Sequence, residues 1–394
     1  MRVVAKFGGT SLGNGDRVNR AADSIAAAVN EGHEVAVVAS AMGSTTDFLL
    51  DAITFEADES DEAEIVSMGE RTSVRMLKAA LGARGIDAKF LEPGTDEWPV
   101  ITDEHGEVDV EETQRRAKKL AADMAAEGYV PVITGFLAQD HAGNVTTLGR
   151  GGSDTTAVMM GNYMNADEVV IVTDVEGVMT GDPRVVEGAR NVGEITVDEL
   201  RNLSFRGAEV VAPSALSYKT GKMSVRVVHY QHGDLLSGGT SIEGQFENLI
   251  DLREEPLACL TVAGRAIRNT PGILSDLSDA MADSDLNIDA VSSGMDSVTF
   301  YVDAEVAERA ENVLHQAVID VEELSSVTVD DNVAVIRITG GELPTQSGIL
   351  EDIIVALSEE HITIQDLITS ATSVSVFIDW DDREAALKQI QNAV

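Results

Sequence analysis

One pattern recurs through the N-terminal part of the chain and restricts its fold: an apolar strand, a turn rich in small residues, then a helical pattern. The runs 3–7, 34–39, 130–136 and 168–173 are mostly apolar and rich in valine or isoleucine, as strands buried on both faces of a parallel sheet are. Apolar residues at helical spacing separate these runs. Such alternation predicts an α/β fold, a parallel sheet with helices on both faces. The further elements predicted are helices at 65–83, 110–127, 198–203 and 208–218, and strands at 88–91, 99–101 and 224–228.

A glycine-rich stretch, residues 146–156, lies between one of these strands and the next helical pattern. It contains Gly149, Gly151 and Gly152 together with Arg150 and Asp154. Glycines let the backbone approach an anion, and the first turn of a helix favours negative charge. The Arg150 guanidinium can hold a carboxylate or phosphate at two points. An ordinary loop with an N-cap residue has the same composition, so the stretch alone leaves both interpretations open.

Two earlier turns also place polar groups at strand ends. Lys6 closes the first strand before Gly8 and Gly9, and a strand, a glycine turn and a helix form a geometry in which the backbone holds phosphate oxygens. The spacing is not that of a Walker A loop. Ser40 and Thr46 lie in the hydroxyl-rich turn after the second strand, at the edge where open α/β sheets bind ligands. A capped helix start explains the same residues.

A long charged turn, residues 173–184, follows the strand 168–173. In a nucleotide-binding α/β domain, ribose and phosphate contacts are expected here, with Arg184 facing phosphate. A surface turn initiated by Asp182 and Pro183 is the alternative.

Glu70 lies close to the apolar side of the helix predicted at 65–83. A carboxylate in that position needs a partner. The partner is either Arg71 or Arg75 in an internal salt bridge, which is the commoner arrangement, or the ammonium group of a substrate.

The last third of the chain contains an internal repeat. Residues 270–303 align without gaps with residues 346–379, with identical pairs such as Gly272 with Gly348. Each unit shows a strand, a helix and two strands, followed by a second helix, in the order of a βαββαβ fold. Such units are too small to be independent enzymes and lack a dense polar site. They indicate either a ligand-sensing module or a module that only assembles subunits.

The composition excludes two classes of partner. The chain has 68 Asp and Glu against 28 Lys and Arg, a net charge of -40, and such a surface repels nucleic acid and anionic membranes. A carboxylate-rich surface keeps a protein hydrated in high salt, so we expect a halophilic source. No apolar run approaches the ~18 residues of a membrane span, which predicts a cytoplasmic protein. The single cysteine, Cys259, is expected to be a core residue.

In chain order these motifs resemble the amino-acid kinase family, and the whole chain resembles the aspartate kinases of that family. The resemblance is carried by residues 6–11, 40–46, 68–71, 149–154, 172–177 and 182–184. It implies a three-layer αβα kinase domain over 1–250, then two ferredoxin-like ACT domains over 257–330 and 331–394. One option is that the last strand swaps back into the first ACT domain. ACT pairing would make the protein a homodimer or homotetramer.

The resemblance also implies a reaction. The γ-phosphoryl group of ATP, bound with Mg2+, would pass to the side-chain carboxylate of L-aspartate, in the first step of lysine, threonine and methionine biosynthesis. A carboxylate is already a nucleophile at neutral pH, so catalysis needs alignment and cancellation of charge rather than a general base. Asp154 would pair with Lys6 or orient the metal shell. The implied catalytic residues are Lys6, Gly8, Gly9, Gly152 and Asp154, and those binding the amino acid are Ser40, Thr46, Glu70, Arg150 and Ser153.

Two further sets of residues follow from the same resemblance. The implied nucleotide-binding residues are Lys6, Gly8, Gly9, Ser11, Thr173, Asp174, Met179, Asp182 and Arg184. An inhibitory amino acid, lysine or threonine, is expected in the first ACT-like unit at Asn269, Gly272, Ile273, Asn287, Ile288, Asp289, Val291 and Asp296.

Three residues depart from the family pattern. Met179 stands where an aromatic residue is common, Glu209 replaces a lysine, and Ala212 replaces a histidine. These changes affect the expected nucleotide contacts and leave the transfer residues intact.

Two other functions remain as alternatives. A kinase for another acidic amino acid, such as glutamate or N-acetylglutamate, is disfavoured by the 68–71 stretch and the ACT pair. A non-catalytic amino-acid sensor on a degenerate kinase domain is favoured by Glu209, but Lys6, Arg150 and Asp154 oppose it.

Overall fold

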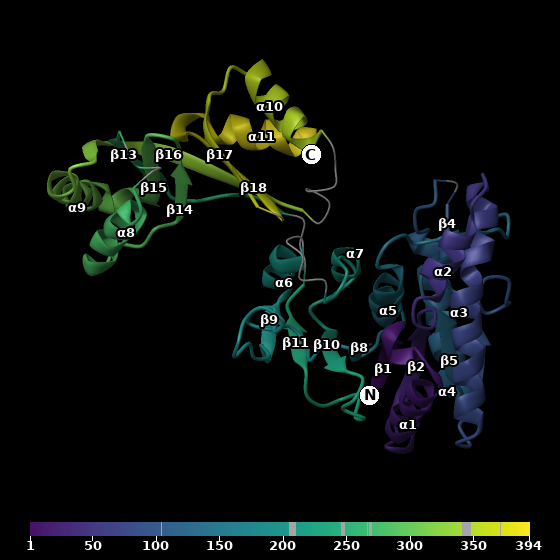
Figure 1. Ribbon diagram of the computed structural model, residues 1–394. Coiled ribbons are helices and arrows are strands. Elements are labelled where there is room, and N and C mark those ends of the chain that lie inside the picture. The colour runs from purple at the N-terminus through teal and green to yellow at the C-terminus, as the bar shows by residue number, and fades with distance from the viewer. Residues whose placement is uncertain are drawn as a thin grey trace. The chain divides into compact units, whose positions relative to one another are not determined.

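The computed structural model divides into two units, residues 1–246 and residues 247–394. An eight-stranded sheet forms the centre of the first unit. The structure describes residues 1–103, 105–204, 210–245, 249–265, 267, 270–340, 348–370 and 372–394. The strand order is β3-β5-β2-β1-β8-β10-β11-β9 (Figure 1). The strands from β3 to β10 are parallel, and β11 is antiparallel to β10. The bounds are β1 Arg2–Phe7, β2 Glu34–Ala39, β3 Ala88–Leu91, β5 Val130–Thr134, β8 Glu168–Thr173, β9 Glu194–Thr196, β10 Ser224–His229 and β11 Thr240–Glu243.

Helices cover both faces of this sheet, because alternate residues of a strand point to opposite sides. Val3 and Val35 pack with α1 and α3 in one core, whereas Val4 and Ala36 pack with α4 and α5 in the other. The three-layer αβα architecture predicted from the sequence is therefore confirmed. The helices of these two layers are α1 Gly15–Asn30, α3 Glu59–Gly82, α4 Val110–Glu127 and α5 Gly152–Tyr163.

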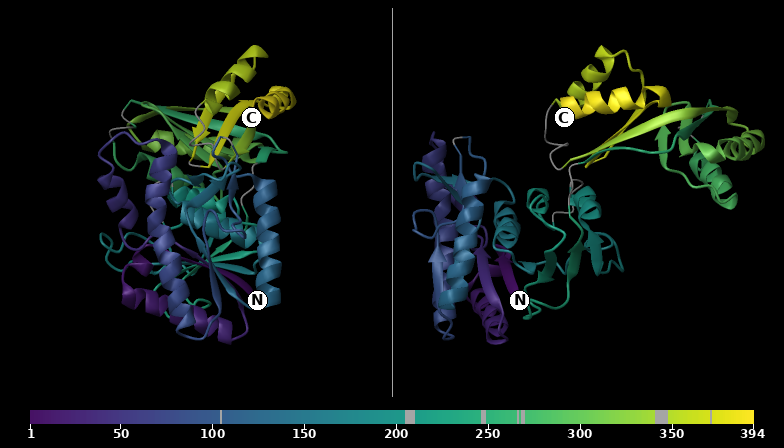
Figure 2. Two further views of the ribbon diagram at one scale, coloured as in Figure 1. Left: turned by 90° about the vertical axis from the view of Figure 1, so that its right-hand side faces the viewer. Right: turned by 180° about the vertical axis from the view of Figure 1, so that it is seen from behind.

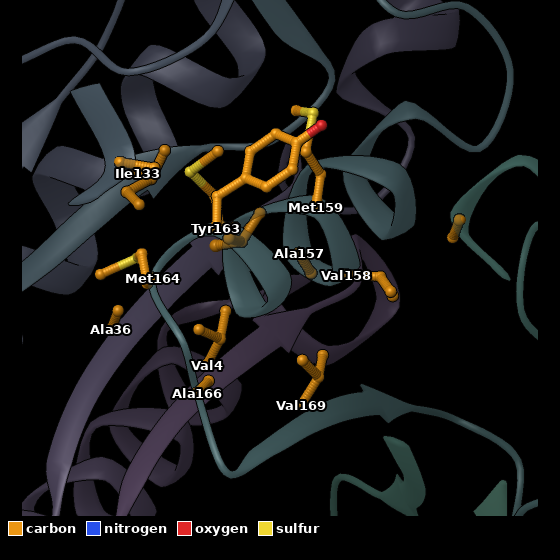
Figure 3. Packing of buried hydrophobic residues seen from close by; sticks show 14 of the residues in the cluster. Val4, Ala36, Ile133, Ala157, Val158, Met159, Tyr163, Met164, Ala166 and Val169 are labelled. Atoms are coloured by element: carbon orange, nitrogen blue, oxygen red, sulfur yellow. The ribbon is translucent and has the colours of Figure 1, made fainter. Parts of the chain in front are cut away.

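Helix α5 is buried along nearly its whole length, unlike an amphipathic surface helix. Figure 3 shows Ala157, Val158 and Tyr163 of this helix above Val4 and Val169 of the sheet. The helix begins at the glycine-rich stretch, so its burial fixes the position of that stretch over the carboxyl ends of the strands.

A small sheet of β4 (Ile101–Thr102), β6 (Leu137–Asp140) and β7 (Val145–Thr147) lies beside the main one in the strand order β4-β6-β7. Only a strand at 99–101 was predicted in this region. The β6–β7 hairpin carries the chain from β5 to α5, and it starts after Phe136, whose φ of 68° is unusual for a residue with a side chain.

Two helices differ from their predicted bounds. Helix α3 begins at Glu59 rather than 65, because the Asp58 side chain caps it by accepting from Asp61 N at 2.8 Å. The helix predicted at 208–218 is α7, Pro213–Leu216, among the described residues. Proline favours the first position of a helix and keeps the residue before it extended. Residues 205–209 lie outside the described part. The remaining helices of this unit are α2 Thr45–Ala52 and α6 Val197–Ser204.

The second unit is built around one long strand, β16 (Leu324–Thr339), which extends through its sheet (Figure 2). Strands β12 (Leu249–Leu252) and β13 (Leu257–Gly264) follow one another along β16, from the pair Leu249–Thr339 to the pair Gly264–Leu324. The other strands are β14 Ala290–Ser293, β15 Ser297–Asp303, β17 Ile364–Thr369 and β18 Ser373–Asp379.

Two βαββαβ modules share this sheet, as predicted. Helices α8 and α9 pack in one core and α10 and α11 in another. The first half of β16 completes the first module beside β13, and its second half lies between β12 and β18 in the second module. The helices are α8 Ile273–Asp283, α9 Ala307–Asp320, α10 Ile349–Glu359 and α11 Arg383–Ala393.

The last strand of the second module, β18, pairs with β16 and β17. The segment that crosses from one module to the other is β12, which precedes the first module and pairs with the second half of β16. Residue 250, expected as the end of the kinase domain, lies within β12. The two modules also meet through side chains: the Tyr301 hydroxyl donates to Asp366 Oδ2 at 3.0 Å, and the Tyr301 and Phe377 rings stack with centroids 4.0 Å apart.

Gly161→Ala tests the close approach of α5 to β8. A methyl group on Gly161 would overlap the Val169 side chain and lie 2.8 Å from Met223 Sδ, so we expect the free energy of unfolding to fall by about 1–3 kcal/mol. Gly82→Ala is the matched control, because no atom lies within 4 Å of a methyl group there. Urea unfolding measures both changes, and equal effects of the two substitutions would contradict the close approach.

Candidate active site

An open cleft of about 700 Å³ lies in the first unit at the carboxyl ends of β1 and β2 and the start of α5, where parallel α/β sheets bind their ligands. Every predicted catalytic or amino-acid-binding residue except Gly8 lines it. Gly8 is close by, with a methyl group built on it 3.4 Å from Lys6 Nζ. The lining residues predicted from the sequence are Lys6, Gly9, Ser40, Thr46, Glu70, Arg150, Gly152, Ser153 and Asp154.

An ion pair joins the two elements that meet in this cleft. Lys6 Nζ of β1 lies 2.7 Å from Asp154 Oδ1 in the first turn of α5, and the two side chains are 12% and 14% exposed. Asp154 Oδ2 accepts a hydrogen bond from Ala212 N at 3.1 Å. Both carboxylate oxygens of Asp154 therefore have partners, an arrangement that suits holding Lys6 in place rather than accepting a proton.

The glycines of the two turns allow the backbones to meet. Gly149 and Gly151 have φ values of 68° and 76°, in the left-handed region that favours glycine. A methyl group on Gly9 would lie 2.8 Å from the carbonyl oxygens of Ala41 and Gly43. The turn after β1 thus packs directly on the turn after β2.

Glu70 reaches the same cleft from α3. Its Oε1 accepts from Ala41 N at 3.2 Å, while Oε2 is buried and has no hydrogen-bond partner among the described residues. Burial raises the pKa of Glu70 to about 7, although hydrogen bonds from the Ala41 N–H and from the Thr46 side chain act in the opposite direction. A buried carboxylate oxygen without a partner fits a cationic group of a ligand.

The salt bridge considered for Glu70 is not formed among the residues that the structure describes. Arg75 holds Glu92 through two contacts of 2.5 and 2.7 Å, and Arg71 lies 3.4 Å from Glu64 and 3.6 Å from Glu92. Both arginines are thus engaged on another side of α3.

The residues predicted to bind nucleotide lie outside the cleft lining, apart from Lys6 and Gly9. Ser11 is buried, and its hydroxyl donates to Val172 O at 3.1 Å. The loop after β8 emerges beside β1, its neighbour in the sheet. In that loop Asp182 and Arg184 are exposed and pair with each other at 2.9 Å. The Thr173 hydroxyl donates to Asp174 at 3.4 Å, and the Met179 backbone forms an isolated antiparallel β-bridge with Asn191. Glu209 lies outside the described residues.

The cleft lining also contains residues that were not among the predicted site residues: Ala41, Gly43, Asp47, Leu50, Phe136, Thr147, Gly149 and Gly151. Asp47 directly follows the hydroxyl-rich turn and was detectable there. Phe136 has no sequence signal, because its place in the cleft depends on the left-handed backbone between β5 and β6.

The residues expected to bind an inhibitory amino acid have different environments. Gly272, with a φ of 101°, is the N-cap of α8, and Ile273 after it is buried in the first module's core. Asp289 pairs with Arg253 at 2.9 Å, and Asp296 O accepts from Gly264 N at 2.9 Å. Asn287 and Ile288 lie between α8 and β14, and Val291 is exposed on β14. Asn269 is outside the described residues.

In the part of the chain that the structure describes, no group of three or more His, Cys, Asp or Glu side chains is arranged to hold a metal ion. Within the same part, every helix is too short or too polar to cross a membrane.

Comparison with known proteins agrees with the fold. The model of the amino acid kinase family matches residues 1–229, and two ACT domain models match residues 260–318 and 328–392. The chain therefore belongs to the amino acid kinase family and, with its ACT domains, to the aspartate kinases within it.

Two curated aspartate kinases match this chain over nearly their full length. The aspartokinase of Helicobacter pylori is 30% identical over 99% of this chain and 98% of its own, and the aspartate kinase of Pseudomonas fluorescens is 33% identical over 99% and 97%. The crystal structure of aspartate kinase from Synechocystis superposes with a TM-score of 0.82 at 27% identity, covering 100% of this chain and 69% of that one.

Glu70→Gln tests the burial of the unpartnered carboxylate through stability. Because the pKa of Glu70 is raised from 4.5 to about 7, the folded state favours the protonated form. The stabilisation of the folded state by protonated Glu70 is fully present below pH 4.5 and is lost as the pH rises through 7. We expect the free energy of unfolding of the wild type, relative to Glu70→Gln, to fall by about 3 kcal/mol over this window.

Urea unfolding between pH 4 and pH 8 measures this difference. Glu62→Gln on the same helix, whose side chain is exposed, is the control and should show no such trend. A pH-independent difference between wild type and Glu70→Gln would contradict the burial described here.

Proposed function

We propose that this chain transfers the γ-phosphoryl group of ATP to the side-chain carboxylate of L-aspartate, giving 4-phospho-L-aspartate and ADP. One observation carries the proposal: a single cleft contains the unpartnered Glu70 oxygen, the Arg150 guanidinium and the Lys6–Asp154 pair. Glu70 fits the ammonium of an amino acid, Arg150 its α-carboxylate, and Lys6 a phosphoryl group. The aspartate kinases among the relatives support this choice of substrate.

The chemistry asks the protein for alignment and cancellation of charge, since a carboxylate nucleophile needs no base. Lys6, held by Asp154, would stabilise the negative charge of the phosphoryl group in transfer, together with the backbone of Gly8, Gly9 and Gly152. Ser40, Thr46 and Ser153 would complete the amino-acid pocket. The position of each residue in or beside the cleft supports these roles.

A magnesium ion fits this site as a companion of the nucleotide. Mg2+ is usually bound by one or two carboxylates and the phosphates rather than by an all-protein cage. Asp154 would hold its water ligands. The ion would neutralise part of the negative charge of the phosphates.

The nucleotide would extend from the phosphate end of the cleft toward the loop after β8. Ser11 lies behind the turn that would hold the phosphates. Thr173, Asp174, Met179, Asp182 and Arg184 would contact ribose, base and phosphate, because this loop leaves the sheet next to Lys6. The exposed Asp182–Arg184 pair would open for such contacts at little cost.

The two ACT domains point to regulation and assembly. We infer that lysine or threonine binds the first ACT domain at the loops 269–273 and 287–296 and changes the rate, and that ACT pairing makes a homodimer or homotetramer. The reaction would then be the first step of lysine, threonine and methionine biosynthesis.

Trapping of the acyl phosphate tests the reaction directly. The protein is incubated in high salt with ATP, Mg2+, hydroxylamine and one of L-aspartate, L-glutamate or N-acetylglutamate, and the acyl hydroxamate is measured. We expect product with L-aspartate. Product only with another acid would make the chain a kinase of that acid, and no product with any would favour a non-catalytic sensor.

Lys6→Ala and Arg150→Ala should each lower kcat/KM for L-aspartate by about 10²–10³, or about 2.7–4 kcal/mol, as removal of a single charge-stabilising donor does. Lys78→Ala is the matched control, because Lys78 is exposed on α3 outside the cleft lining. A near-wild-type rate for either cleft variant would refute the role given to that residue.

Titration calorimetry with lysine and with threonine tests the regulatory site. We expect heat of binding and a changed rate of hydroxamate formation for one of the two amino acids. Asp296→Ala should weaken that binding and leave the rate without effector unchanged. The absence of both heat and rate change with either amino acid would rule out the proposed effectors.

A further inference from the structure

The segment 210–214, which precedes and begins α7, touches the transfer site through its backbone. Ala212 N donates to Asp154 Oδ2 at 3.1 Å, while Asp154 Oδ1 holds Lys6 Nζ at 2.7 Å. Ala212 is the residue that departs from the family's histidine. Any residue except proline supplies this N–H, so the departure leaves the contact with Asp154 intact.

The chain is closely packed around this contact. A methyl group on Gly151 would overlap the Ala212 side chain, so the N-terminus of α5 and Ala212 are in direct van der Waals contact. Pro213 occupies the first position of α7 and Ala212 has extended backbone angles (φ −61°, ψ 132°). Proline favours such an extended residue before it, and the Ala212 N–H therefore points away from α7 toward Asp154.

A second hydrogen bond runs beside the first. Thr155, the neighbour of Asp154, and Ser214, two residues after Ala212, have hydroxyl oxygens 2.9 Å apart. Thr155 is 6% exposed. The two contacts, Ala212 with Asp154 and Ser214 with Thr155, connect the first turn of α5 to the start of α7 at two adjacent points.

We propose that Thr155 and Ser214 are positioning residues for phosphoryl transfer: their hydroxyl pair keeps the Ala212 N–H on Asp154, and Asp154 in turn keeps the Lys6 ammonium directed into the cleft. This inference rests on the proposed function. Neither hydroxyl lines the cleft, so their effect passes through Asp154 and Lys6. Because Lys6 acts on the phosphoryl group, loss of the pair should lower kcat and leave binding of the amino acid unchanged.

The test compares kcat and KM for L-aspartate in the hydroxamate assay. We expect Thr155→Val and Ser214→Ala each to lower kcat by roughly tenfold, the effect of about 1.4 kcal/mol from one hydrogen bond, with KM within about twofold of wild type. The double variant should be no slower than Thr155→Val, because Thr155→Val already removes the bond to Ser214 together with the 3.3 Å bond that the Thr155 hydroxyl donates to Gly151 O. Thr155→Ser, which keeps the hydroxyl, should restore kcat.

Thr102→Val is the matched control. It removes a hydroxyl pair of the same length in the same unit, Thr102 with Thr146 at 2.9 Å, and neither residue lines the cleft. We expect kcat to stay within about twofold. Thermal unfolding of each variant checks that the protein in the assay is folded. Ser214→Ala is the variant least expected to affect folding, because the Ser214 side chain is exposed.

The outcomes separate the two claims. If the wild type is active, three results would overturn the positioning role and leave the proposed function standing. They are an unchanged kcat in Ser214→Ala, additive losses of kcat in the double variant, and an equal loss of kcat in Thr102→Val. A wild type that gives no acyl hydroxamate overturns the proposed function and the positioning role with it.

Discussion

The ion pair between Lys6 and Asp154 is the interaction on which the rest of the site depends. It joins the end of β1 to the first turn of α5, so it forms only when the strand register and the start of the buried helix are both correct. Removing one member of a mostly buried pair leaves an uncompensated charge, at a cost of about 3–5 kcal/mol. Asp154 is held further by the Ala212 N–H, and the Lys6 amine is thereby held in the cleft lining.

Much of this was predictable from the sequence because its determinants are local. Strands buried on both faces are continuous apolar runs, and α4 has its predicted bounds because Asp109 caps it and Gly128 ends it. The convergence of Lys6, Ser40 and Arg150 on one cleft was also predictable, since parallel strands present their carboxyl ends at one edge of the sheet.

The remainder depends on residues far apart in the chain. The sequence allowed Glu70 a partner in Arg71 or Arg75, but Glu92, at the end of β3, engages both arginines, and only the packed structure decides between these pairings. The position of Phe136 depends on a left-handed turn that its side chain disfavours. The early start of α3 depends on a single capping aspartate, Asp58, in a segment whose acidic composition suggests a solvated loop.

The long strand β16 has a consequence for how the second unit can change over evolution. Each module contains half of β16. The edge strand of the second module is β12, which precedes the first module in the chain. A deletion or exchange of one module would therefore expose unpaired backbone in the other. The two modules are therefore one structural unit, although their sequences repeat each other. Because β16 runs through both modules, a twist of one module would be transmitted to the other through the backbone of this strand.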